Sequence, residues 1–190
     1  MNFLKRIGSF FLDIIQTVTL ALSVFVVIYL FLFQPHQVKG QSMSPAFLNQ
    51  EFLLTDKISY RFNKPQRGDV IVFKAPSSEA CAEIECEYIK RIIGLPGEKI
   101  KIQAGKVSIN NKILEEPYLP HNLSTQPGNF LKEQTDYQIP FNSFIVFGDN
   151  RPASRDSREF GPIDRSAIIG RAFFRYWPIN RLSLVANTNR

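Results

Sequence analysis

The chain has 190 residues and a formal net charge of +6, and 44% of its residues are hydrophobic, including 17 phenylalanines. This length and apolar content predict one compact domain and exclude wholesale disorder. The two cysteines and two histidines are too few for a disulfide scaffold or a thiolate zinc site, and the basic residues are scattered rather than gathered in a nucleic-acid-binding tail. We therefore expect no cofactor, no metal and no nucleic-acid partner.

The first part of the chain predicts a membrane anchor. Seventeen successive residues from Thr17 to Phe33 carry no charge, and the apolar stretch extends back to Phe10, which as a helix gives ~36 Å and is enough to span a bilayer with tilt. Lys5 and Arg6 precede the stretch, and positive charge stays on the cytoplasmic side. We expect a short cytoplasmic N-terminus at 1–8, a transmembrane helix at 9–33 and an extracytoplasmic domain at 36–190.

Two other interpretations of this apolar stretch are weaker. A cleavable signal peptide has a shorter apolar region that ends in a small-x-small site, whereas Phe31 and Phe33 occupy the corresponding positions here. A buried core helix that is apolar on all sides does not suit a domain this small. A retained anchor places the domain in the periplasm, the thylakoid lumen or the cell exterior, attached to the plasma, inner or thylakoid membrane.

The rest of the chain predicts an all-β domain. Short β-rich runs alternate with Gly-, Pro- and Asn-containing turns, and no helical apolar period persists. We expect strands near residues 52–58, 69–73, 88–93, 99–103, 106–109, 144–147 and 168–176. The polar stretch 115–140 contains four prolines and predicts a long surface excursion. The aromatic run 173–178 fits either a membrane-facing patch or core packing.

Two segments could supply nucleophilic chemistry. Ser42 lies in a tight segment between Gly40 and Pro45, and Lys90 lies in a strand of bulky apolar residues that would place it on a partly buried face with Tyr88. A lysine serves as base for a serine only when it is neutral, and burial can lower its pKa to ~7–8. Composition alone favours the commoner alternative, an edge or snorkelling lysine.

Histidine-based catalysis has little support in the sequence. His36 follows the apolar stretch directly, His121 lies in the proline-rich excursion, and no G-x-S-x-G elbow is present. We expect both histidines to be exposed polar residues.

Four blocks resemble type I signal peptidases, the membrane-bound Ser-Lys endopeptidases of family S26 that remove signal peptides from exported preproteins. The blocks, in the order of the family, are 42–45 (Ser-Met-Ser-Pro), 67–73, 88–97 and 148–163. Each block alone is weak, but the four in order behind an N-terminal anchor are specific. The fold implied is a single antiparallel β-rich catalytic domain with coiled β-sheets of the signal-peptidase and LexA-like type, and one N-terminal transmembrane helix.

The resemblance implies a role for each matching residue. Ser42 matches the nucleophile, Lys90 the general base and Ser154 a serine whose hydroxyl hydrogen-bonds the lysine amine. Met43 and Tyr88 match positions that line the site. The remaining matches would form charged pairs that brace the loop carrying the second serine: Asp149, Arg151, Asp156 and Arg158. Ser44 and Ser157 are neighbouring hydroxyls that we do not expect to act as nucleophiles.

Three positions depart from the family pattern. Gly40 stands where some members carry a serine that helps the oxyanion hole, so the hole would need the Ser42 N–H and another donor. Ala46-Phe47 replaces Thr-Leu, which should alter packing more than chemistry. Pro152-Ala153 replaces a polar pair just before Ser154, which should change the direction in which the loop presents the Ser154 hydroxyl.

The implied activity is cleavage of extended preprotein signal peptides after small residues, at the surface of a membrane whose lipid is a further partner. A processing peptidase dedicated to one substrate and an inactive, membrane-tethered peptide-binding paralogue are the alternatives. A soluble self-cleaving repressor would lack the anchor and carry a DNA-binding domain. In an oxidising compartment, Cys81 and Cys86 could form a local disulfide.

Overall fold

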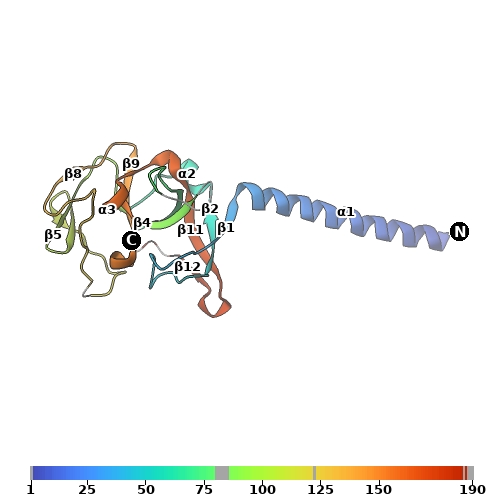
Figure 1. Ribbon diagram of the computed structural model, residues 1–190. Helices are drawn as coiled ribbons and strands as arrows, with labels where there is room; N and C mark the ends of the chain where they lie inside the picture. The colour runs from blue at the N-terminus through green and yellow to red at the C-terminus, as the bar shows by residue number, and fades with distance from the viewer. Residues whose placement is uncertain (1, 80–85, 122, 186, 188–190) are drawn as a thin grey trace.

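The N-terminal helix stands apart from the β-rich remainder of the chain (Figure 1). A computed structural model describes residues 2–79, 86–121, 123–185 and 187. Helix α1, Asn2–Phe31, contains a 24-residue apolar stretch, Arg6–Tyr29, none of which is buried against the domain. Its serine and threonine hydroxyl groups bond to carbonyls one turn back, as Thr17 does to Asp13, so they do not demand outside partners. The helix is therefore long and apolar enough to cross a membrane.

The helix begins and ends earlier than the sequence predicts. It stops at Phe31, and Phe33 already belongs to strand β1, Phe33–Gln37, which no sequence signal indicated. Strand β1 pairs antiparallel with β2, Phe52–Asp56. Pro35 is accommodated because β1 lies at the edge of its sheet, where a missing N–H costs no ladder bond. The chain thus passes directly from the apolar helix into the sheet.

The larger sheet carries most of the domain. Its strand order within the described residues is β1-β2-β11-β3-β4-β9-β10, with β12 also paired to β11, and every pairing is antiparallel. The further strands are β3 (Val70–Lys74), β4 (Glu87–Gly94), β9 (Ser143–Phe147), β10 (Ile163–Asp164), β11 (Ile168–Trp177) and β12 (Ser183–Leu184). The predicted all-β, antiparallel fold class is confirmed.

A smaller sheet lies at the end of the domain away from α1 (Figure 1). It has the order β7-β6-β5-β8, with strands β5 (Lys99–Gln103), β6 (Lys106–Ile109), β7 (Lys112–Ile113) and β8 (Tyr137–Gln138). Ala104, Gly105, Asn110 and Asn111 take positive φ in its two turns, which is why these turn residues allow a tight meander.

The stretch 115–140 is not the purely surface excursion that its composition predicts. Thr125, Leu131 and Ile139 are buried, and Leu131 and Ile139 pack into the cluster formed by the smaller sheet and β9. The stretch carries the apolar side chains that cover one side of this cluster, so its prolines and polar residues mark an irregular path rather than an exposed one.

Short helical turns complete the fold: α2 (Ser59–Phe62), α3 (Ser157–Phe160), η1 (Arg151–Ala153), η2 (Arg165–Ala167) and η3 (Ile179–Arg181). Two buried clusters flank the larger sheet. One contains Met43, Phe47, Leu53 and Val70, and the other contains Phe73 and its neighbours from β4 and β9. The first cluster anchors the loop that follows β1, and this loop carries Ser42.

Candidate active site

Ser42 is held at the surface of the domain by the buried residue beside it. Met43 is 1% exposed and packs with Phe47 in the core, while Ser42 itself is half-buried. The Phe47 N–H donates to the Met43 carbonyl at 2.9 Å, and the Asn150 N–H donates to the Ser42 carbonyl at 3.0 Å. These bonds fix the backbone at Ser42 and at the residue that follows it.

Lys90 meets Ser42 from strand β4. Its side chain is buried, and its Nζ donates to Ser42 Oγ at 2.8 Å and to the Ile89 carbonyl at 3.0 Å. The Tyr88 ring lies on the same face of the strand, 5.2 Å from Nζ. The two residues that the resemblance implies as nucleophile and base are thus brought together across 48 positions of sequence.

Burial favours the neutral form of the Lys90 amine. It lowers the pKa of Lys90 from 10.5 to about 8, because the ammonium form loses its hydration there, and the nearby Asp156, Asp149 and Glu79 oppose this effect only in part. At pH 8 about half of the Lys90 side chains are therefore neutral and able to take a proton.

Ser154 lies beside this pair, but without the hydrogen bond that the resemblance implies. Its Oγ is buried and has no hydrogen-bond partner among the described residues, Lys90 included. A Cβ on Gly148 would lie 2.2 Å from Ser154 Oγ and 2.4 Å from the Ser42 carbonyl oxygen. Gly148 is thus the position that lets the Ser154 loop approach the Ser42 loop.

The four charged residues of the fourth block all form ion pairs, but only two of them pair within the predicted set. Asp156 and Arg158 pair with each other at 2.8 and 2.9 Å, and Asp156 also accepts the Gly148 N–H. Asp149 pairs instead with Arg91, and Arg151 with Glu116. The sequence did not predict either of these pairings, because a sequence pattern does not show which distant residues meet in the fold.

A groove of about 690 Å³ opens beside the Ser42–Lys90 pair. One wall is β1 and the loop to Ser42, and the other is the start of β4 with Ala153 and Arg155. In the described part of the chain β1 pairs with β2 alone, and β9 pairs with β4 only from Arg91 onward. Two unpaired strand edges therefore face the groove.

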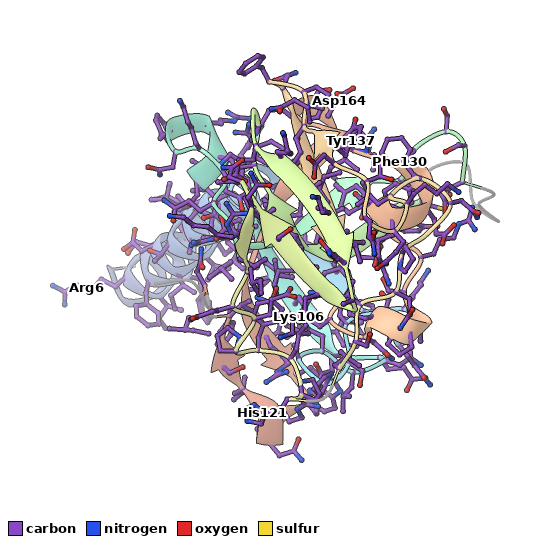
Figure 2. All side chains as sticks on the ribbon, turned by 90° about the vertical axis from the view of Figure 1, so that its left-hand side faces the viewer. Arg6, Lys106, His121, Phe130, Tyr137 and Asp164 are labelled. Carbon is purple, nitrogen blue, oxygen red and sulfur yellow. The ribbon has the colours of Figure 1, made fainter. Side chains whose placement is uncertain are left out.

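His36 is not the exposed residue that we expected. It lines the groove, its Nδ1 lies 2.9 Å from Thr55 Oγ1, and its Nε2 lies 2.9 Å from Glu87 Oε2 on the opposite wall. His121 is exposed at the rim of the domain, as expected (Figure 2). Among the described residues no group of His, Cys, Asp or Glu is arranged to hold a metal ion.

The contacts of three further residues bear on the other expectations from the sequence. Ser157 Oγ is buried and accepts the Val146 N–H, which explains why this hydroxyl is structural. Gly40 has φ +95° and donates its N–H to Asn49, so it adds no side-chain donor to an oxyanion hole. Cys86 is disulfide-bonded and lines the groove, whereas Cys81 lies outside the described residues.

Comparison with known proteins identifies the family. A family model described as "Signal peptidase, peptidase S26" matches residues 11–177. The chain belongs to this family. It is 38% identical over 175 residues to signal peptidase I of Leptolyngbya laminosa, covering 88% of this chain and 80% of that protein, and 31% identical over 180 residues to signal peptidase IB of Staphylococcus aureus, covering 89% and 91%.

A crystal structure of a signal peptidase I from Enterococcus faecalis is also similar, with 32% identity and a TM-score of 0.44, covering 57% of this chain and 97% of that one. Membership in peptidase S26 makes the chain a serine endopeptidase by class. Sequence reasoning missed four charged residues that form ion pairs around the site. Arg91 pairs with Asp149, Glu116 pairs with Arg151, and Glu79 pairs with Arg155.

Proposed function

We propose that this chain is a membrane-anchored endopeptidase that removes N-terminal signal peptides from exported preproteins, with Ser42 as nucleophile and Lys90 as general base. The observation that carries the proposal is the 2.8 Å contact between Lys90 Nζ and Ser42 Oγ at the end of a groove. The lowered pKa of Lys90 supports the same assignment, because a base must be neutral before it can accept the serine proton.

The reaction follows from these two groups. Neutral Lys90 takes the Ser42 proton as Oγ attacks the carbonyl carbon of the scissile peptide. The C–N bond then breaks, the proton passes from Lys90 to the leaving amine, and the signal peptide remains as an ester on Ser42. Water, deprotonated by Lys90, attacks the ester and releases the carboxylate of the signal peptide and the free serine.

The groove suits an extended peptide. A substrate strand between β1 and the first half of β4 would use the N–H and C=O groups that both edges leave unpaired within the described residues. Small residues on the acyl side of the cut are implied by the family resemblance, and shallow pockets next to the Ser42–Lys90 pair would exclude larger side chains.

Anchoring would bring the enzyme to its substrate. We propose that α1 crosses the membrane with Lys5 and Arg6 on the cytoplasmic side and the β-rich domain on the other. Ser42 follows β1 closely, so the nucleophile stays within a short reach of the membrane surface, where a signal peptide emerges. The exposed Trp177 and Ile179 at the β11–η3 corner support a membrane-facing surface.

The direct test is cleavage of a labelled preprotein by the full-length protein in detergent, with N-terminal sequencing of the product. Ser42→Ala and Lys90→Ala should each abolish cleavage, whereas the matched control Ser44→Ala should retain it. Normal cleavage by either of the first two variants would refute the dyad. A panel of unrelated preproteins separates a general signal peptidase from one dedicated to a single substrate, and cleavage of none by folded wild type would favour an inactive paralogue.

A further inference from the structure

The segment between β2 and β3 carries an exposed basic and aromatic surface that the proposed catalysis does not use. It comprises the half-buried Lys57 and the exposed Arg61, Phe62 and Lys64, here called the basic corner. Phe62 is 82% exposed, and Arg61 and Lys64 are exposed on either side of it. None of these residues lines the groove, so the proposed catalysis at Ser42 and Lys90 assigns this surface no role.

The basic corner lies where the chain leaves the apolar helix. The Lys57 N–H donates to the Leu32 carbonyl at 3.1 Å, one residue after α1 ends. The strand register places the same two segments side by side, because Phe33 of β1 pairs with Asp56 of β2. Figure 1 shows α2 in the half of the domain nearest α1. If α1 spans a bilayer, this corner lies at the level of the headgroups.

The positive charge of the corner is not neutralised by its acidic neighbours. Asp56 accepts bonds from the Ile58 and Ser59 N–H groups, and Asp69 accepts bonds from the Tyr60 hydroxyl and the Gln66 N–H. Asp69 also accepts a hydrogen bond from Asn187 and lies 3.9 Å from Arg171, so both carboxylates have partners outside the basic corner's cations. Within the residues that the structure describes, no ion pair involves Lys57, Arg61 or Lys64.

We propose that the basic corner binds the headgroups of anionic phospholipids, with the Phe62 ring inserted at the membrane interface. Three clustered cations attract an anionic lipid surface, and an aromatic ring among them is stable at the boundary between headgroups and acyl chains. This inference rests on the membrane anchoring proposed above. It adds a second contact that would restrain rotation of the domain about the end of α1 and so hold the groove at a constant orientation to the bilayer.

The test uses the full chain in lipid nanodiscs of phosphatidylcholine alone or with phosphatidylglycerol, and follows amide hydrogen exchange in residues 57–66. We expect exchange there to slow several-fold only in the anionic discs, and the slowing to disappear in Lys57→Gln/Arg61→Gln/Lys64→Gln. Phe62→Ser should weaken it. The matched control, Lys106→Gln/Lys112→Gln/Lys132→Gln, removes the same charge from exposed lysines at or near the smaller sheet, where Lys106 is labelled in Figure 2.

Equal exchange in both kinds of disc, or loss of the slowing in the control variant, would overturn the basic corner as a lipid site. A chain that enters neither kind of disc would overturn the anchoring and this inference together. Preprotein cleavage, measured in the same discs with Ser42→Ala as background, reports on the proposed peptidase separately, because none of the residues substituted in the basic corner or in the lysine control lines the groove.

Discussion

Arg91 and Asp149 form a buried bidentate ion pair, with Nε and Nη2 of the arginine 2.8 and 2.7 Å from the two carboxylate oxygens. The pair joins the strand that carries Lys90 to the loop that carries Ser154. Removing one partner of such a pair leaves a buried charge without its counter-ion and costs about 3–5 kcal/mol. Asp149→Asn should therefore lower the unfolding midpoint of the full-length protein markedly.

The control for this variant is Asp136→Asn, which breaks an exposed pair with Lys101 and should move the midpoint little. The double variant Arg91→Met/Asp149→Leu should be less destabilised than the sum of its single variants, because the two residues act as one unit. Additive losses would show that the pair does not couple the strand to the loop.

Cleavage should depend on pH through Lys90. Because burial lowers the pKa of Lys90 to about 8, the active neutral form grows tenfold per pH unit below that value and levels off above it. The rate at pH 6 should be about 100-fold below the plateau. A rate measured with a neutral-side-chain peptide that stays flat from pH 6 to pH 9 would contradict a lysine base.

The same buried amine should weaken the fold. Between the folded pKa of about 8 and the unfolded value near 10.5, the unfolded chain binds more protons, so the stability of the wild type should rise with pH in that window. Lys90→Met should raise the free energy of unfolding at pH 7, and its advantage should shrink as the pH approaches 11. The measurement is denaturant unfolding of both proteins at pH 7 and pH 10.5, and a Met variant that is less stable at pH 7 would contradict the expected burial cost.

Gly148 should tolerate no side chain. An added Cβ would lie 2.4 Å from the Ser42 carbonyl oxygen, which is backbone and cannot move away cheaply. Gly148→Ala should therefore reduce kcat by at least about 100-fold, because a shift of ~1 Å at the nucleophile is enough for that loss. Removing the second clash with Ser154→Gly in the same chain should not restore the activity, and restoration would show that the Ser42 backbone adapts.

Strand alternation and turn residues were enough to predict most of the fold. The seven expected strands all form, and Gly- and Asn-containing turns at Ala104–Gly105 and Asn110–Asn111 connect the strands of the smaller sheet. Strands β1, β7, β8, β10 and β12 were missed because they are short or contain proline, and pairing with neighbouring strands creates them rather than local propensity.

The site was predictable only in part from physics. Alternation along β4 placed Lys90 on a buried face, but its meeting with Ser42 came from the family resemblance, because no local rule brings two residues 48 positions apart together. The same alternation could have indicated Arg91: an arginine in an apolar strand, on the face opposite Lys90, requires a buried carboxylate. Which carboxylate it is depends on tertiary contacts that the sequence pattern does not report.

Strand β4 presents two different cations on its two faces, an amine toward the groove and a guanidinium toward Asp149. A shift of one residue in the pairing register of β4 would exchange the two side chains, because successive side chains point to opposite faces of a strand. The displaced strand would keep every residue of the motif, but the guanidinium would then face the groove. A guanidinium stays protonated near neutral pH, so it cannot accept a proton there. The strand lengths of such a chain are therefore constrained as well as its residue identities. An insertion or deletion between Gly68 and Lys90 must fall in the connection between β3 and β4, where it leaves the register of the two strands unchanged.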